Sequence, residues 1–288
     1  MIARPTSFGS NRPPFAPVSV PPRYVPHMAQ PKVLAMGLKR LERESVWLDP
    51  EADRVHWRGH KLERRWSLGG KVWQVLPSAI DAACELADWV ADEPFTPVTA
   101  AGLRRFRPEE RLWQASLAVP EDLVVMVPDG DTYRLGAASL CSPSHWRLEE
   151  KIGRTMREIH DPIPGIHDVL SPRIDRFFAT QREDFPIERY NWALQDDAEL
   201  YALPDHRSAA VAADAPLWYR VERQTLRRLP VSGALAFTIR VYMNPLASLQ
   251  SIDGAIPALL AAIDATPPAL AEYKSFDRYA PALARWRA

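Results

Sequence analysis

Hydrophobic and polar positions along the central part of the chain predict a series of β-strands. Apolar residues dominate segments 121–127 and 132–141, and the Pro-Asp-Gly-Asp sequence at 128–131 lies between them. Two apolar runs separated by such turn residues predict a β-hairpin. The preceding apolar run at 112–119 is also interpreted as a strand.

Further strands and helices follow from the same kind of pattern. Residues 187–195 predict one strand, and residues 218–243 predict two strands joined across 229–233. Segment 78–92 predicts a helix, as does the chain from residue 251 onward, where a Pro-Pro pair divides the helical region. Hairpins with helices segregated from them are typical of an α+β fold with an antiparallel sheet.

One segment, "SPSHWRLEEKIGRTMREIHDPIPG" at 142–165, combines an apolar stripe with a histidine. Leu148, Ile152 and Met156 recur every four residues, and the next position on this row is His160. On a helix such positions share one face. We therefore predict a helix that starts near Ser144, ends at the following Asp-Pro pair, and turns His160 toward the interior.

Two interpretations of His160 are open at this point. One is a buried neutral histidine bonded to a backbone carbonyl at the helix end. The other is an axial ligand of haem iron at the edge of an apolar pocket. His145 and His167 are the competing ligands. Apolar residues that lie near enough in sequence to line such a pocket are Trp146, Ile163, Phe177 and Phe178.

The strand "RVERQTLRRLP" is unusually rich in arginine. In an extended chain, Arg223 points to the face opposite Arg220 and Glu222, and neither face is cleanly hydrophobic. A solvated sheet face with cross-strand ion pairs is one explanation. The other is that some of these charges enter a pocket, where an arginine polarises a diatomic ligand and a glutamate holds a cationic amine.

Composition excludes several functional classes. The 288 residues carry 36 basic and 36 acidic side chains, so no net field attracts nucleic acid or an anionic membrane. No apolar run approaches the ~20 residues of a membrane span. Only 12 glycines are present, and neither dinucleotide-binding nor phosphate-loop motifs occur. His56 and His60 are four residues apart in a charged context, which favours surface histidines over a metal pair.

The two cysteines also limit the cofactors of this chain. Cys84 and Cys141 cannot supply the four thiolates of an ordinary iron–sulfur cluster or an all-cysteine zinc site. Both are expected to be inert core thiols, and haem-thiolate ligation by either is the alternative.

The first 31 residues contain eight of the 28 prolines and form a Pro-rich arm that we expect to be mobile or extended. The arm lacks the pattern of a signal peptide, from which we expect a cytoplasmic location. Residues 32–288 are expected to form a single domain with a helical C-terminal extension.

Several longer motifs resemble the haem-dependent oxidative N-demethylase α-subunit-like family. They are "GLKRLERESVWLDP", "EDLVVMV", "LCSPSHWRLEEKIGRTMREIHDPIPG", "RYNWAL", "RVERQTLRRLPVSGALAFTIRVYM" and the "YK" at 273–274. The resemblance implies a PAS-like fold, in which an antiparallel sheet and helices enclose haem b. It also implies that His160 is the proximal iron ligand, with Met156 and Ile163 beside the cofactor. Arg223, Glu222 and Arg220 follow as residues of the distal pocket.

The activity implied by this resemblance is that of a haem monooxygenase subunit. It would oxidise a small secondary amine such as dimethylamine with O2. Electrons would come from a partner reductase that carries the NADPH, FMN and [2Fe–2S] sites. A haem-binding PAS-type gas or redox sensor without catalysis is the alternative.

Overall fold

The structure is a computed structural model that describes residues 21–33, 37–41, 47–50, 52–166, 177–178, 180–203 and 209–287. Within these ranges, seven strands form one sheet in the order β1-β5-β6-β7-β3-β4-β2, and every neighbouring pair is antiparallel. The strands are β1 (Lys39–Arg40), β2 (Trp73–Val75), β3 (Asp122–Asp129), β4 (Thr132–Ser139), β5 (Ile187–Gln195), β6 (Trp218–Arg228) and β7 (Leu235–Pro245).

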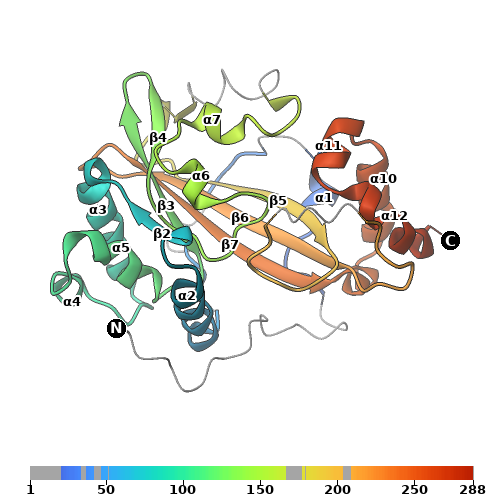
Figure 1. Cartoon of the computed structure of the whole chain (residues 1–288), viewed down its shortest axis with the longest axis horizontal. Coiled ribbons are helices and arrows are strands. Elements are labelled where there is room, and N and C mark those ends of the chain that lie inside the picture. Colours follow the sequence, from blue (N-terminus) through green and yellow to red (C-terminus); the bar gives the residue numbers. More distant parts are fainter. Residues whose placement is uncertain are drawn as a thin grey trace.

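Helices gather at the two ends of the long strands and over one face of the sheet (Figure 1). At one end lie α2 (Arg54–Leu68), α3 (Ile80–Ala91), α4 (Ala100–Leu103) and α5 (Pro108–Ser116). At the other end lie α1 (Pro26–Ala29), α10 (Ala255–Asp264), α11 (Pro268–Tyr273) and α12 (Phe276–Leu283). The short helices α6 (Leu148–Lys151) and α7 (Met156–His160) lie above the sheet between these groups. None of the described helices has the length and apolar character needed to cross a bilayer. The fold is therefore α+β.

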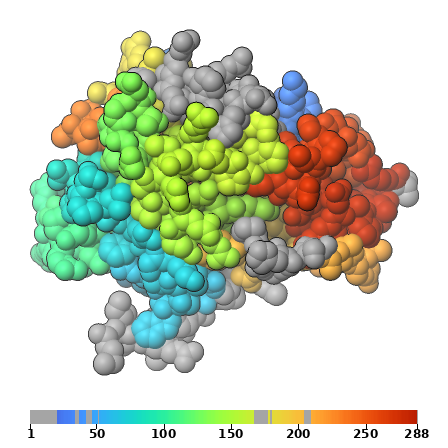
Figure 2. Space-filling model, turned by 45° about the horizontal axis from the view of Figure 1, so that its top comes forward, coloured from blue at the N-terminus to red at the C-terminus, as the bar shows by residue number. Residues whose placement is uncertain are grey.

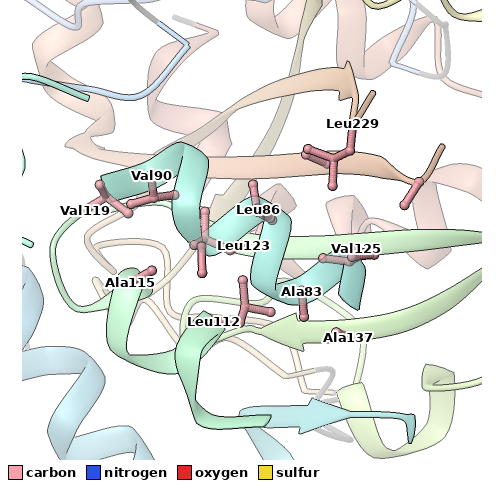
Figure 3. Close-up of a cluster of buried hydrophobic side chains, with 14 of the residues drawn as sticks. Ala83, Leu86, Val90, Leu112, Ala115, Val119, Leu123, Val125, Ala137 and Leu229 are labelled. Atoms are coloured by element: carbon pink, nitrogen blue, oxygen red, sulfur yellow. The ribbon is translucent and has the colours of Figure 1, made fainter. Parts of the chain in front are cut away.

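Three larger apolar clusters hold these layers together. The first joins α3 and α5 to β3, and Leu86, Leu112 and Leu123 lie at its centre without solvent exposure (Figure 3). The second covers the face of the sheet beneath α6 and α7. The third packs the C-terminal helices against β5 and β6. The second cluster matters most for function, because it borders the main cavity.

Most predicted elements are present. The hairpin of β3 and β4, strand β5, and the pair β6–β7 confirm the strand predictions, and α3 and the C-terminal helices confirm the helical ones. The strand predicted at 112–119 is wrong, because that segment contains the second half of α5. Pro108 opens this helix and Glu109 and Glu110 occupy its first turn, where acidic side chains favour the positive helix end.

The single helix predicted to end at His160 is also wrong, because the chain leaves helical geometry between α6 and α7. Gly153 adopts a φ of +77°, its N–H donates to Leu135 O at 2.8 Å, and Leu135 N–H donates to Arg154 O at 2.9 Å. The chain between the two helices is therefore hydrogen-bonded to the edge of β4. A new helix then starts at Thr155, whose side chain forms a reciprocal capping box with Glu158.

The described part of the Pro-rich arm, residues 21–31, packs on the C-terminal helices. The ring of His27 in α1 is fully buried, with Nδ1 2.7 Å from Tyr219 Oη and Nε2 2.9 Å from Ala255 O. Val33 and Leu38 continue this path and reach the main cavity. The arm expected at residues 1–31 otherwise lies outside the described residues.

Candidate functional site

The main cavity lies between the sheet, α7 and α11, and has a volume of about 260 Å³. In the space-filling view, the yellow-green surface of the α6–α7 region adjoins the red C-terminal helices that flank this space (Figure 2). Most of the lining is apolar. These residues are Val33, Leu38, Val124, Met126, Leu135, Trp146, Met156, Ile159, Ile163, Ile166, Phe177, Phe178, Ile187, Leu226, Phe237, Ile239 and Leu270.

Polar side chains form the rest of the lining. They are Ser144, His145, His160, Arg189, Asn191, Glu222, Gln224, Thr225, Tyr273 and Lys274. Sheet register explains where several of them lie. Asn191 pairs with Glu222 and Arg189 pairs with Gln224, whereas the next pair on this face is Ile187 with Leu226. The floor of the cavity therefore changes from polar to apolar along β5 and β6.

His160 lies at the C-terminal end of α7 and lines the cavity together with Met156 and Ile163. Its Nδ1 is 2.8 Å from Met156 O. A carbonyl oxygen can only accept, so Nδ1 carries a proton, and in the neutral ring Nε2 would carry the lone pair. A backbone carbonyl that fixes the tautomer in this way is the usual outer partner of a metal-binding histidine. A buried histidine with a purely structural role would make the same hydrogen bond.

The residues of this cavity fit a haem group in their donor chemistry. An imidazole with its tautomer fixed borders a predominantly apolar space, and a porphyrin needs both an axial ligand and an apolar surface. His145 is the other described histidine in the lining, and its Nδ1 is 2.7 Å from Ser144 Oγ. His167, the third ligand considered, lies outside the described residues. Cys84 and Cys141 do not occur among the described residues of the lining.

Glu222 is the buried anionic group of the cavity, with a side chain only 10% exposed. Arg220 Nε donates to its Oε1 at 3.0 Å, and Gln224 Nε2 donates to its Oε2 at 3.1 Å. Burial by itself raises the pKa of Glu222, but the positive charges of Arg220 and Lys274 outweigh burial and leave the pKa below its ordinary value. Glu222 is therefore ionised at neutral pH.

Lys274, directly after α11, lines the same cavity and interacts electrostatically with this carboxylate. Its Nζ is 3.4 Å from both Asn191 Oδ1 and Trp192 O. Burial is the main reason why its pKa falls from 10.5 to about 8; Glu222 opposes the fall, and Arg189 and Arg220 add to it. A lysine with a pKa this close to neutrality can both hold and release a proton under physiological conditions.

The arginines predicted for the distal pocket take different positions. Arg220 is fully buried behind Glu222, and its Nη atoms donate to Leu200 O at 3.0 Å and Ser142 O at 2.6 Å. Arg223 points to the opposite face of the sheet, where its Nε donates to Glu188 Oε2 at 3.0 Å. Among the described lining residues, Glu222 is therefore the member of the predicted trio that borders the cavity. The expected solvation of this strand is wrong, since Arg220, Glu222 and Arg223 are all buried. The expected cross-strand ion pair is present between Arg223 on β6 and Glu188 on β5.

Arg220→Met is expected to lower the free energy of unfolding by about 3 kcal/mol, because it leaves the buried Glu222 charge and two carbonyls without their donor. Arg223→Met is the matched control on the same strand. It removes an ion pair to the partly exposed Glu188, for which we expect about 1 kcal/mol. Urea denaturation of both variants measures the difference. Equal losses would contradict the central role of Arg220.

Arg189, Asn191 and Lys274 are polar lining residues to which the sequence assigned no role. The signal for the first two was the alternation along 187–195, which places them on the same strand face as Ile187. Lys274 lies in the "YK" motif, but no local sequence pattern predicts that the end of this helix lies beside β5.

His60, Cys84 and Cys141 lie outside the described lining of the main cavity. The prediction of a surface position for His60 is wrong: the ring is 3% exposed and Nε2 donates to Cys141 O at 3.0 Å. Burial lowers the pKa of His60 to about 3. Cys141 is buried as expected, whereas Cys84 is only partly buried and lies 3.8 Å from Arg111 Nη1. In the described parts of the chain, no three His, Cys, Asp or Glu side chains gather as a metal site.

Comparison with known families gives one match that covers this region. The sequence model of the family described as "Haem-dependent oxidative N-demethylase, alpha subunit-like" matches residues 95–284. The matched range includes α7, β5, β6 and the end of α11, and so contains His160, Glu222 and Lys274. The family description itself names haem-dependent oxidative chemistry and an alpha subunit, which implies a partner subunit.

Proposed function

We propose a function from the premise that this chain belongs to the haem-dependent oxidative N-demethylase, alpha subunit-like family. The chain would be the haem-carrying catalytic subunit that oxidises a small secondary amine, such as dimethylamine, with O2 and electrons supplied by a partner. One observation carries the proposal. A single cavity presents a histidine on its apolar side and a buried carboxylate on its polar side.

His160 would hold the haem iron through Nε2, because Nδ1 donates to Met156 O. Met156 and Ile163 would contact the macrocycle with the other apolar residues of the lining, and so exclude water from it. When bound, haem b supplies the iron at which O2 is reduced. A PAS-like arrangement of the sheet and helices around the cofactor is part of this proposal.

Glu222 would bind the substrate as an ammonium ion. Dialkylamines, like lysine, are protonated at neutral pH, and a buried carboxylate gains most from a cation when water is excluded. Asn191 and Gln224 donate toward Glu222 Oε2 at 3.4 and 3.1 Å, which holds the carboxylate in one orientation. The apolar side of the cavity would accept the methyl groups of the amine.

Lys274 and Arg189 would supply positive charge at the polar end of the cavity. Lys274 Nζ can donate a proton and recover it, because its pKa is about 8. Arg189 keeps its charge throughout and so acts by electrostatic stabilisation. Arg220 acts through Glu222 rather than on the substrate, so it is a positioning residue. The position of Arg223 on the opposite sheet face gives it no contact with this space.

Electrons would come from a separate reductase that carries the NADPH, FMN and [2Fe–2S] sites. The composition supports this division, because the sequence lacks nucleotide-binding loops and has two cysteines. The proposed location of this assembly is the cytoplasm.

Formaldehyde release tests the proposal directly. Purified protein is loaded with haem, supplied with a reductase and O2, and given dimethylamine. We expect formaldehyde and methylamine in equal amounts, together with an amine-induced shift of the haem absorption band. A protein that takes up haem but neither binds amines nor releases formaldehyde would contradict the enzymatic function and favour the sensor.

Amine oxidation is expected to fall as the pH rises through about 8, because Lys274 loses its proton there. The shifted pKa of a lysine means that the protonated form exists below this value and is lost above it. Lys274→Met should lower kcat at pH 7 about a hundredfold. It should also remove the fall of kcat above about pH 8, the alkaline limb of the pH profile. A pH profile of kcat for both proteins measures the effect. An unchanged limb in the variant would assign the titration to another group.

A further inference from the structure

Lys274 combines a buried setting with access to a cavity. The chain has six lysines, which are Lys32, Lys39, Lys61, Lys71, Lys151 and Lys274. Lys274 is the lysine among the described lining residues of the main cavity, and it keeps part of its surface accessible. Its amine therefore lies where small molecules that enter this space can meet it.

The hydrogen bonds of Lys274 hold its nitrogen loosely. Nζ lies 3.4 Å from both Asn191 Oδ1 and Trp192 O, which is longer than the roughly 2.7–3.2 Å of ordinary N–H···O bonds. Both partners are acceptors of a protonated amine. Once the amine loses its proton, its lone pair needs no strong bond to be broken before it can react.

Lys61 provides a contrast within the same fold. It has no solvent exposure, and its Nζ donates to Ser116 O at 2.9 Å and to Glu121 O. It is not among the described lining residues of the main cavity. Lys61 is therefore an internal reference for a lysine that is buried without access to that space.

The surroundings of Lys274 favour the neutral amine at moderate pH. Burial, together with the charges of Arg189 and Arg220, lowers its pKa from 10.5 to about 8, while Glu222 opposes the fall. About one-tenth of such amines are neutral at pH 7, against about one in three thousand for an ordinary lysine. A lysine in a desolvated site next to other cations is a typical nucleophile toward carbonyl carbon.

We propose that Lys274 is a carbonyl-binding residue, at which small aldehydes such as formaldehyde form a reversible imine. The inference goes beyond the proposed oxidation, because imine formation needs neither haem nor O2. Only the identity of formaldehyde as the aldehyde met during turnover rests on the proposed function. Formaldehyde would then arise in the cavity that Lys274 lines, and the imine would delay its release.

The reaction balances without an oxidant or a reductant. The ammonium group first loses a proton, and the neutral nitrogen attacks the carbonyl carbon, so that a C–N bond forms and the C=O bond becomes a C–O bond. A proton moves from nitrogen to oxygen and gives a carbinolamine. The proton lost at the start returns to the hydroxyl group, the C–O bond breaks, and water leaves. Overall, one ammonium ion and one aldehyde give one protonated imine and one water molecule.

Glu222 favours the product of this reaction as well as the free amine. The carboxylate is ionised and interacts electrostatically with Lys274. The positive charge of the ammonium ion is retained in the protonated imine, so the same carboxylate stabilises both. The apolar part of the lining limits the water that would hydrolyse the imine.

Reductive trapping on the full chain tests the proposal. Protein with and without bound haem is treated at pH 7 with deuterated formaldehyde and cyanoborohydride, which reduces a protonated imine to a methylated lysine. Peptide mass spectrometry gives the initial rate at each of the six lysines. Lys274 should be methylated at least tenfold faster than the exposed Lys71, and haem should change this rate less than threefold. Lys61 should stay unmodified.

Unfolding and substitution provide the controls. In urea, the rates at Lys274, Lys61 and Lys71 should agree within threefold, because the selectivity depends on the fold. Lys274→Arg keeps a positive charge beside Glu222 but removes the amine. It should leave the rates at the other lysines unchanged in the folded protein.

The outcomes that overturn the proposal differ from those that overturn the proposed function. A folded chain in which Lys274 reacts no faster than Lys71 overturns the proposal. Loss of the reaction at Lys274 when haem is bound also overturns it, because haem would then exclude the aldehyde. A chain that traps formaldehyde at Lys274 but neither binds haem nor oxidises dimethylamine would overturn the proposed function and support this inference.

Discussion

His160→Ala is expected to give a folded protein that no longer shows the absorption spectrum of histidine-ligated haem. The variant removes Nε2, the nitrogen that we propose as the iron ligand, together with Nδ1, which donates to Met156 O. Haem uptake should fall at least a hundredfold, because the variant lacks the imidazole that we propose as the axial ligand. Titration of the protein with haem, followed in the visible spectrum, measures both the affinity and the ligation state.

Folding of this variant is measured separately. His160 is half-buried at a helix end, so the loss of its bond to Met156 should cost about 1 kcal/mol and lower the Tm by a few degrees. Imidazole added to the variant should restore the histidine-type spectrum, since it can occupy the space of the lost ring. His145→Asn is the matched control and should retain the spectrum. A wild-type spectrum in His160→Ala would exclude His160 as the ligand.

Local patterns predicted most of the sheet because its strands bury alternating or continuous apolar positions. Strand β5 follows the predicted range, and β6 and β7 meet near the predicted turn. The strand prediction for 112–119 was wrong for a general reason. A short apolar run buried on several sides has no distinctive period, so it does not tell a strand from a helix. Pro108 and the two glutamates that follow it were the signal for α5.

The backbone path from α6 to His160 depends on long-range contacts, which no local sequence pattern predicts. Leu148, Ile152 and Met156 do pack in one apolar cluster, but the row from Leu148 to His160 is divided between two short helices. Gly153 breaks the helix because its left-handed backbone pairs with Leu135 on β4. A residue about twenty positions away therefore decides where α7 starts, and spacing on an ideal helix cannot anticipate this.

The faces of β6 could not be assigned from the sequence for a similar reason. Both faces of this central strand are covered, so charged residues on each face find partners inside the protein. Glu222 faces the main cavity, whereas Arg223 pairs with Glu188 on the other side. Lys274 reaches the same cavity from a helix about fifty residues later. Alternation gives two faces but does not say which one meets the cavity.

Glu222→Gln is expected to weaken amine binding by about a hundredfold to a thousandfold. The substitution keeps the size and shape of the side chain, replaces one acceptor oxygen by an NH2 donor, and removes the buried charge that would hold the ammonium group. It leaves Arg220 and Lys274 as excess positive charge around the amine. Titration of the haem-loaded variant with dimethylamine, followed by the haem absorption shift, measures the loss.

Glu188→Gln is a closely matched control for this experiment. Each glutamate accepts from an arginine Nε at 3.0 Å on the same pair of strands, but Glu188 does so on the face away from the cavity. Its replacement should therefore leave amine binding within threefold of the wild type. Equal losses in both variants would mean that disturbed strand pairing, rather than a missing anion, weakens the site.

The Glu222→Gln variant has a second readout, which a purely structural role of Glu222 would not produce. Glu222 raises the pKa of Lys274 and so opposes the lowering caused by burial, Arg189 and Arg220. Without this carboxylate the pKa of Lys274 should fall below 8, and the alkaline limb of kcat should move to lower pH by the same amount. Glu188→Gln should not move it. A limb that stays near pH 8 in Glu222→Gln would separate Lys274 from Glu222, and the polar end of the cavity would not act as one charge-coupled site.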